Sequence, residues 1–217
     1  MTLLLPHLLL GVVLLFFPRP WLQKVVTLAK RRKKKSDVER LKDPWKNREP
    51  GDPAVQFGTE FKKFRNYIDL ARAAAGSVAI WGGFGYSAAV AGGGITGLLV
   101  KAAIMLAGVA IQATRLHGGR FSFFPPIFYL AGILLGICGW EVAVFAFILT
   151  WAMNSMVPNA SWFLTLNAAI VYGFGAFFHG MFSLTVILAA GLVFLPVMLS
   201  LLANRPLMIY TSRGGGK

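Results

Sequence analysis

The 217-residue sequence is both strongly apolar and strongly basic, and it keeps these two properties in different segments. Hydrophobic residues make up 56% of the chain, and the formal net charge is +14. Residues 19–72 hold 16 of the 22 Lys and Arg, whereas Glu141 is the one acidic residue from position 73 onward. A soluble globular domain distributes its charge more evenly, so this segregation predicts a membrane protein with a basic region at an anionic lipid surface.

The composition also argues against several kinds of chemistry. Cys138 is the single cysteine, which excludes an intrachain disulfide and a multi-cysteine metal site. The sequence has no paired-acid metal motif, no plausible catalytic triad and no dinucleotide-binding fingerprint. We therefore predict no catalytic residue and no metal site, and the sequence identifies no cofactor.

The N-terminal membrane segment, residues 1–18, contains an apolar run from Leu3 to Phe17. No Lys or Arg precedes this run and no small-residue cleavage site follows it, so it is expected to stay uncleaved. Fifteen helical residues span about 22 Å, which is short of the roughly 30 Å hydrocarbon core. The segment must thin the bilayer, extend through Trp21 or lie partly in the interface, and spanning is the favoured interpretation.

A basic cytoplasmic loop is predicted over residues 19–72. Its central run is expected to bind anionic lipid headgroups, and it consists of Lys30, Arg31, Arg32, Lys33, Lys34 and Lys35. Towards its end, Phe57, Phe61, Phe64 and Ile68 recur at helical spacing with basic residues between them. This pattern predicts an amphipathic helix at the membrane interface.

The remainder is predicted to be an all-α transmembrane bundle over residues 73–203, followed by a cytoplasmic tail over residues 204–217. Spans of about 20 residues suit helices and are too long for barrel strands. With the N-terminal segment the bundle gives about seven spans, the later six being 73–91, 95–113, 121–140, 142–153, 162–178 and 181–203.

The distribution of basic residues predicts the orientation of these spans. Seven crossings with the N-terminus outside place 21 of the 22 Lys and Arg on the cytoplasmic side of a plasma or inner membrane. Residues 121–153 leave an alternative, because they could form one long helix in place of a hairpin at Gly139–Glu141. One helix would give six spans and an external C-terminus, so the charge distribution favours the hairpin.

Three ionisable residues are the candidates for ligand binding or proton relay. Lys101, Glu141 and His179 all fall towards the outer face in the predicted topology. Ionisable residues inside a membrane are functional candidates by default, and these could bind an anionic headgroup or pass protons. The alternative is that Lys101 extends its side chain to the interface while the other two contact water.

Small residues crowd several of the predicted spans. They allow close approach of membrane helices, although a groove for a flat ligand or a lipid chain is the alternative. The glycines predicted to serve helix packing are Gly82, Gly93, Gly97, Gly132 and Gly136.

These observations support three hypotheses of function. The first is a non-catalytic subunit or scaffold of a membrane assembly, anchored at an anionic inner leaflet and in contact with other membrane proteins. The second is a small transporter or lipid-handling protein that uses the Lys101, Glu141 and His179 face. The third is a membrane enzyme acting on lipid-linked phosphates, which the absence of an evident general base disfavours. Nucleic acid is disfavoured as a partner, because the basic run adjoins membrane spans and lacks interleaved aromatic residues.

Overall fold

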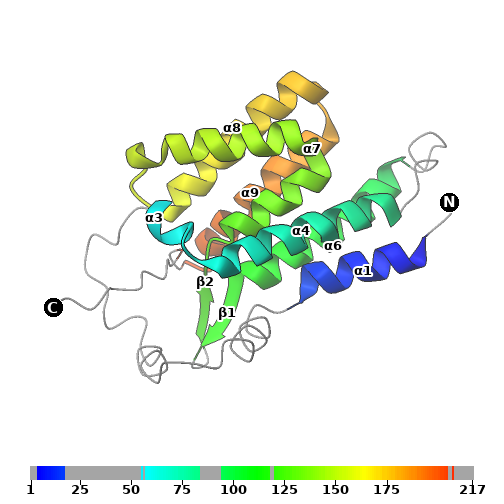
Figure 1. Ribbon diagram of the computed structural model, residues 1–217, viewed down its shortest axis with the longest axis horizontal. Coiled ribbons are helices and arrows are strands. Elements are labelled where there is room, and N and C mark those ends of the chain that lie inside the picture. Colours follow the sequence, from blue (N-terminus) through cyan, green and yellow to red (C-terminus); the bar gives the residue numbers. More distant parts are fainter. Residues whose placement is uncertain are drawn as a thin grey trace.

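The computed structural model describes residues 4–17, 55, 57–83, 94–117, 120–204 and 207, which form a helical bundle with one small β-hairpin (Figure 1). The all-helical class predicted from the sequence is confirmed. The long helices are α1 (Leu5–Phe16), α4 (Phe64–Gly83), α6 (Gly94–Ala113), α7 (Ile127–Ala152), α8 (Ala160–His179) and α9 (Leu184–Leu202). The short elements are α3 (Phe57–Glu60), β1 (Thr114–His117), β2 (Arg120–Phe123) and the 3-10 helix η2 (Asn154–Met156).

Several of these helices have the length and composition of membrane spans. Among the described residues, four segments are long and apolar enough to cross a bilayer, namely Thr96–Ala113, Ile127–Ala152, Ala160–His179 and Leu184–Leu202. Helix α1 is also apolar but has only 12 residues. A chain with four such helices has the character of an integral membrane protein.

The predicted amphipathic helix over Phe57–Ile68 is wrong as a continuous element. Helix α3 ends at Glu60 and α4 begins at Phe64. The Asn66 side chain donates to both the main-chain and the side-chain oxygen of Glu60, and Lys63 forms an ion pair with the same carboxylate. These local bonds compete with a continuous helix and turn the chain between the two elements.

The predicted boundary at residues 114–126 also differs from the structure. Residues expected to form a basic loop are paired instead as the antiparallel β1–β2 hairpin, with Thr114 opposite Phe123. Helix α7 therefore begins at Ile127 and not at Phe121, because a helix that began at Phe121 would have Pro125 and Pro126 beyond its first turn, where proline removes a hydrogen bond and clashes with the preceding turn. Residues 127–152, which form α7, contain no proline.

Helix α7 reverses direction at Gly139, where the backbone is not helical (φ 81°, ψ 171°). In a straight helix, Phe128 and Trp151 would lie about 34 Å apart along the axis. Their ring centroids are only 6.4 Å apart, and those of Phe128 and Phe147 are 5.6 Å apart. The chain thus folds back at the position where the sequence predicted a turn, and Figure 1 shows the two arms of α7 meeting at a sharp corner.

Two ends of the bundle can be distinguished by the residues that meet there. The β-hairpin end contains β1–β2, Phe17 and Val55, and the Gly139 end contains the corner of α7 and the last residue of α8, His179. Helix α1 runs antiparallel to α4, because Gly11 faces Ile80 and Leu15 faces Gly76. Glycine is needed at both contacts, since an added Cβ would lie within 2.9 Å of the opposing side chain.

Later helices continue to alternate between these ends. The first arm of α7 runs beside α4 towards the Gly139 end. Helix α8 runs towards the same end, from Phe163, which contacts Trp151, to His179, which contacts Cys138. Helix α9 returns, and beyond it Leu207 forms a bridge with Phe123 of β2. The core between these helices is mainly apolar, and nine polar or charged residues are also buried in the described part of the chain.

Candidate functional site

The three ionisable residues predicted to form a site lie on different elements. Lys101 is on α6, and its Nζ lies 4.4 Å from the centroid of the Trp81 ring on α4. His179 ends α8, and its Nε2 donates a 2.8 Å hydrogen bond to the carbonyl of Cys138, since that oxygen can only accept. Glu141 begins the second arm of α7, with its carboxylate turned back towards Gly139.

The structure brings Glu141 and His179 to the same corner of α7, because Cys138 lies only three residues before Glu141. Lys101 contacts α4, and no ion pair within the described residues joins any two of the three. A proton relay or a composite headgroup site through all three is thus not assembled by direct contacts.

A buried polar cluster that the sequence did not predict occupies the β-hairpin end. We call it the arginine clamp, and it consists of Asp69, Arg72, Gln112 and Tyr129, each no more than 7% exposed. Arg72 donates through Nε to Asp69 at 2.8 Å and through Nη2 to Gln112 at 2.9 Å. Its guanidinium also lies 5.1 Å from the centroid of the Tyr129 ring. This stacked, paired geometry is the one in which a buried arginine is best compensated.

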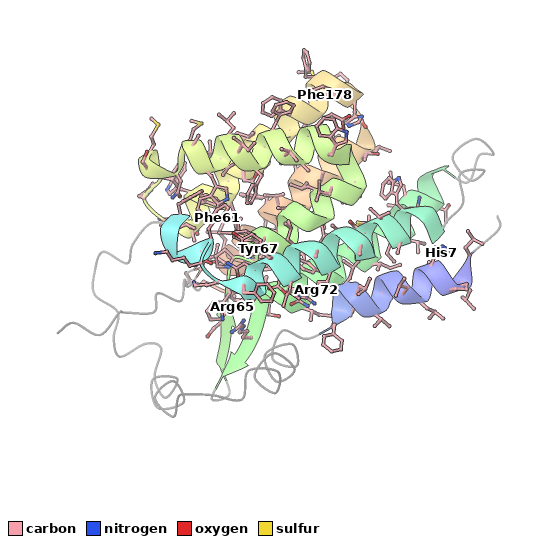
Figure 2. All side chains as sticks on the ribbon, viewed as in Figure 1. His7, Phe61, Arg65, Tyr67, Arg72 and Phe178 are labelled. Carbon is pink, nitrogen blue, oxygen red and sulfur yellow. The ribbon has the colours of Figure 1, made fainter. Side chains whose placement is uncertain are left out.

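The clamp holds the C-terminal end of α1, as Figure 2 shows at the labelled Arg72. The carbonyl of Phe17 accepts from Arg72 at 2.6 Å and from Gln112 at 3.2 Å. The carbonyl of Leu15 accepts from the Tyr129 hydroxyl at 2.9 Å and from Gln112 at 3.3 Å. The last carbonyls of a helix lack intrahelical partners, and a cation there also complements the helix dipole. The clamp therefore fixes the point where the chain leaves α1.

The sequence contained the members of this cluster but not their association. Asp69 and Arg72 are three residues apart in a helix, a spacing that permits their ion pair. Gln112 and Tyr129 come from distant segments, and the acceptors are main-chain carbonyls of α1. Every residue has a main-chain carbonyl, so a sequence does not show which carbonyls act as acceptors. The clamp could therefore be identified only from the packed structure.

A second attachment at the same end involves aromatic rings around Trp151. Phe61 and Phe57 place their ring centroids 5.2 and 5.4 Å from that of Trp151, and Phe163 contacts it from α8 at 5.0 Å. Next to this aromatic cluster, Asn154 donates a hydrogen bond to the carbonyl of Val55, a residue that is 1% exposed. The chain is thus attached to the bundle again where it enters α3, and Phe61 and Tyr67 mark this region in Figure 2.

Two of the predicted packing glycines lie in very close helix contacts. A Cβ added to Gly132 would lie 2.4 Å from the carbonyl oxygen of Leu70, and one added to Gly136 would lie 2.2 Å from Oγ of Ser77. By contrast, Gly82 and Gly97 have open space where a side chain would be, and Gly93 is outside the described residues. The first pair joins α7 to α4, whereas the other two make no such contact.

The predicted headgroup-binding run, Lys30–Lys35, is also outside the described residues. Within the part of the chain that is described, no three His, Cys, Asp or Glu side chains gather where they could hold a metal ion. Some of the polar groups that are buried there join two helices, as in the bond from Thr150 to Asn167.

Comparison with known proteins gives no further assignment. No protein-family model matches the chain, and no curated protein or solved structure matches it. The class of protein is therefore defined by the fold alone, as an integral membrane helical bundle.

Proposed function

We propose that this chain is a non-catalytic membrane scaffold that holds a basic cytoplasmic loop against an anionic inner leaflet, as a subunit of a membrane assembly. The observation that carries the proposal is the attachment of both ends of that loop to one end of the bundle. Phe17 is held by the arginine clamp, and Val55 is held by Asn154 beside the aromatic cluster. The 37 residues between them contain 12 of the 22 Lys and Arg.

Attachment at both ends has a physical consequence for lipid binding. A loop whose ends are held beside the bilayer keeps its charges at a high effective concentration near the headgroups. Each Lys or Arg close to an anionic surface contributes about 1 kcal/mol to binding. The clamp and the aromatic cluster would then serve to position the loop and not to perform chemistry.

The proposal includes seven membrane crossings with the N-terminus outside and the C-terminus in the cytoplasm. It is supported by the alternation of seven helical segments between the two ends, when the arms of α7 are counted separately. Each arm is 12 to 13 residues and thus about 20 Å long, so the bilayer must be thinner there or the corner must lie below the outer surface. Either arrangement returns the chain to the same side after α7.

Lipid binding by the loop can be tested on the full chain purified in mild detergent. Replacing all six residues of Lys30–Lys35 with Gln should lower the amount of copurifying phosphatidylglycerol, measured by lipid mass spectrometry. Replacing Arg205, Arg213 and Lys217 with Gln is the control for loss of charge elsewhere and should have a smaller effect. Unchanged lipid retention in the six-residue variant would refute the anchoring role.

The scaffold role requires a protein partner as well. Gentle purification of the tagged chain from its native membrane should recover at least one membrane protein in stoichiometric amount. A homogeneous chain without such a partner, even after chemical crosslinking in the membrane, would contradict a role in an assembly. It would favour the second candidate, a lipid-handling protein, for which the apolar groove described below is the specific observation.

A further inference from the structure

An apolar groove with a volume of about 540 Å³ runs along the outer surface of the bundle between the second arm of α7 and α8. This volume is in the range of about 300–1,000 Å³ that is usual for small-molecule sites. Its walls are hydrophobic side chains, among them Phe145 and Leu149 from α7 and Phe174 and Phe177 from α8. Gly173 forms part of the floor, and nothing lies within 4 Å of the position that its Cβ would occupy.

Glu141 is not part of the apolar lining, but it lies one helical turn from Phe145 towards the Gly139 end. Residues 141, 145 and 149 are spaced by four, so they share one face of the second arm of α7. The Glu141 carboxylate therefore lies beyond the last apolar turn of the groove. His179 ends α8 at the same level, because it is bonded to Cys138 next to the corner. The groove thus has an apolar body and a polar end.

The charge of Glu141 has no cationic partner within the described residues. Lys101 lies over Trp81, and His179 uses Nε2 for the Cys138 carbonyl. A partly buried carboxylate at the edge of a membrane is costly without a cation or hydrogen-bond donors.

We propose that this groove binds a phospholipid with a primary ammonium headgroup, such as phosphatidylethanolamine, with one acyl chain along the phenylalanines and the ammonium at Glu141. The apolar body and the polar end of the groove together indicate this ligand. Aliphatic chains are the molecules that a bilayer presents to a groove lined in this way, and an ammonium gives Glu141 a charge-assisted hydrogen bond. The site rests on membrane insertion and is independent of the basic loop.

The experiment compares lipid retention by the full chain in detergent, using phosphatidylethanolamine and phosphatidylglycerol with identical acyl chains. Native mass spectrometry counts the lipids that stay bound after titration with each. The wild-type chain should retain phosphatidylethanolamine preferentially, and Glu141→Gln should reduce that preference about tenfold, the loss expected for one charged hydrogen bond. Equal retention of the two lipids by the wild type, or an unchanged preference in Glu141→Gln, would refute the headgroup assignment.

The acyl-chain part is tested with Gly173→Leu, which fills the floor of the groove. Gly191→Leu on α9 is the matched control, because its Cβ position is equally free of neighbours within 4 Å. Gly173→Leu should lose the bound lipid while Gly191→Leu keeps it. Phe177→Ala is a second variant that should weaken retention, and its site is 82% exposed, so the fold does not depend on it.

The same measurements distinguish lipid binding in the groove from lipid binding by the basic loop and from occupation of the groove by a second copy of the chain. Loss of phosphatidylethanolamine in the variant with Lys30–Lys35 neutralised would contradict an independent site. If Gly173→Leu changes the mass of an oligomer but leaves lipid retention intact, a second copy of the chain occupies the groove and the lipid proposal is wrong. Unaltered lipid retention in both Gly173→Leu and Phe177→Ala would likewise overturn it.

Discussion

The guanidinium of Arg72 donates a 2.6 Å hydrogen bond to the main-chain carbonyl of Phe17, 55 residues earlier in the chain. This bond joins the helix that follows the basic loop to the helix that precedes it. The same guanidinium is paired with Asp69, so the attachment of α1 and the neutralisation of a buried carboxylate depend on one side chain. Loss of Arg72 should therefore affect stability strongly.

We predict that Arg72→Met destabilises the protein by about 3–5 kcal/mol, the usual effect of removing one partner of a buried ion pair. The Asp69 carboxylate and the carbonyl of Phe17 would each lose the hydrogen bond that Arg72 donates. Thermal unfolding in detergent measures the change, with Arg65→Met as the control, since Arg65 is exposed. The double variant Asp69→Asn, Arg72→Met should lose less stability than the sum of the single variants. Additive losses would mean that the ion pair is not the stabilising contact.

The corner of α7 depends on glycine in a different way. The φ and ψ angles of Gly139, 81° and 171°, fall in a region that is open almost only to glycine. We expect Gly139→Ala to cost about 1–3 kcal/mol through backbone strain. Gly191→Ala, placed within α9 with open space around it, should be neutral or slightly stabilising because it raises helix propensity. Equal melting temperatures for the two variants would exclude a strained corner.

Gly132 is predicted to tolerate no larger side chain, for a steric reason. A methyl group there would lie 2.4 Å from the Leu70 carbonyl oxygen and 2.8 Å from the Cβ of Ala73, so α7 must move away from α4. Gly132→Ala is expected to lower the free energy of unfolding by about 1–3 kcal/mol, as overpacking does. The comparison is Gly97→Ala on α6, where nothing lies within 4 Å. A stable Gly132→Ala variant would show that the two helices are less closely packed than described.

These glycines also show how much of the fold the sequence could predict. The apolar runs predicted a helical membrane protein, because composition acts locally, and the distribution of basic residues favoured a turn at Gly139. The sequence could not separate Gly132 from Gly97, since each is a small residue in an apolar segment. The neighbouring helix alone decides whether the small size of a glycine permits a close helix contact. The same limit applies to Phe61, because helical spacing alone does not reveal that its ring packs against Trp151.

The candidate site was less predictable than the fold. Lys101, Glu141 and His179 were grouped by their depth in the predicted topology, but depth does not place side chains around the bundle axis. Within the described residues, no ion pair joins Lys101 to either of the other two, and Lys101 lies over Trp81 instead. The structure adds the groove near Glu141 and the clamp around Arg72. Both additions depend on contacts between segments far apart in the chain.

The seven-crossing topology can be tested by cysteine accessibility in intact cells. Single cysteines at Ser36, His117 and Ser212 should react only after the membrane is permeabilised, because all three are proposed to be cytoplasmic. A cysteine at Trp140, which is 64% exposed at the corner of α7, should react from outside or stay protected by lipid. Labelling of Ser212 from outside while Ser36 stays protected would show an odd number of crossings between them and would contradict the proposal.

The last prediction concerns Lys101, whose Nζ lies 4.4 Å from the centroid of the Trp81 ring. This geometry is that of a cation–π interaction, which is worth roughly 0.5–2 kcal/mol depending on exposure. It gives the ammonium a favourable position on α6 without Glu141. We therefore expect the stability of the protein to couple Lys101 to Trp81 and not to Glu141.

A double-mutant cycle measures this coupling directly. Lys101→Met and Trp81→Leu together should destabilise the protein by about 0.5–1 kcal/mol less than the sum of their separate effects. Lys101→Met and Glu141→Gln should be additive within about 0.5 kcal/mol, as independent sites are. Thermal unfolding of the five variants in one detergent provides the values. If the second pair shows the larger coupling, Lys101 and Glu141 act together. Glu141 would then have a cationic partner within the chain, which removes the reason for an ammonium headgroup at the end of the groove.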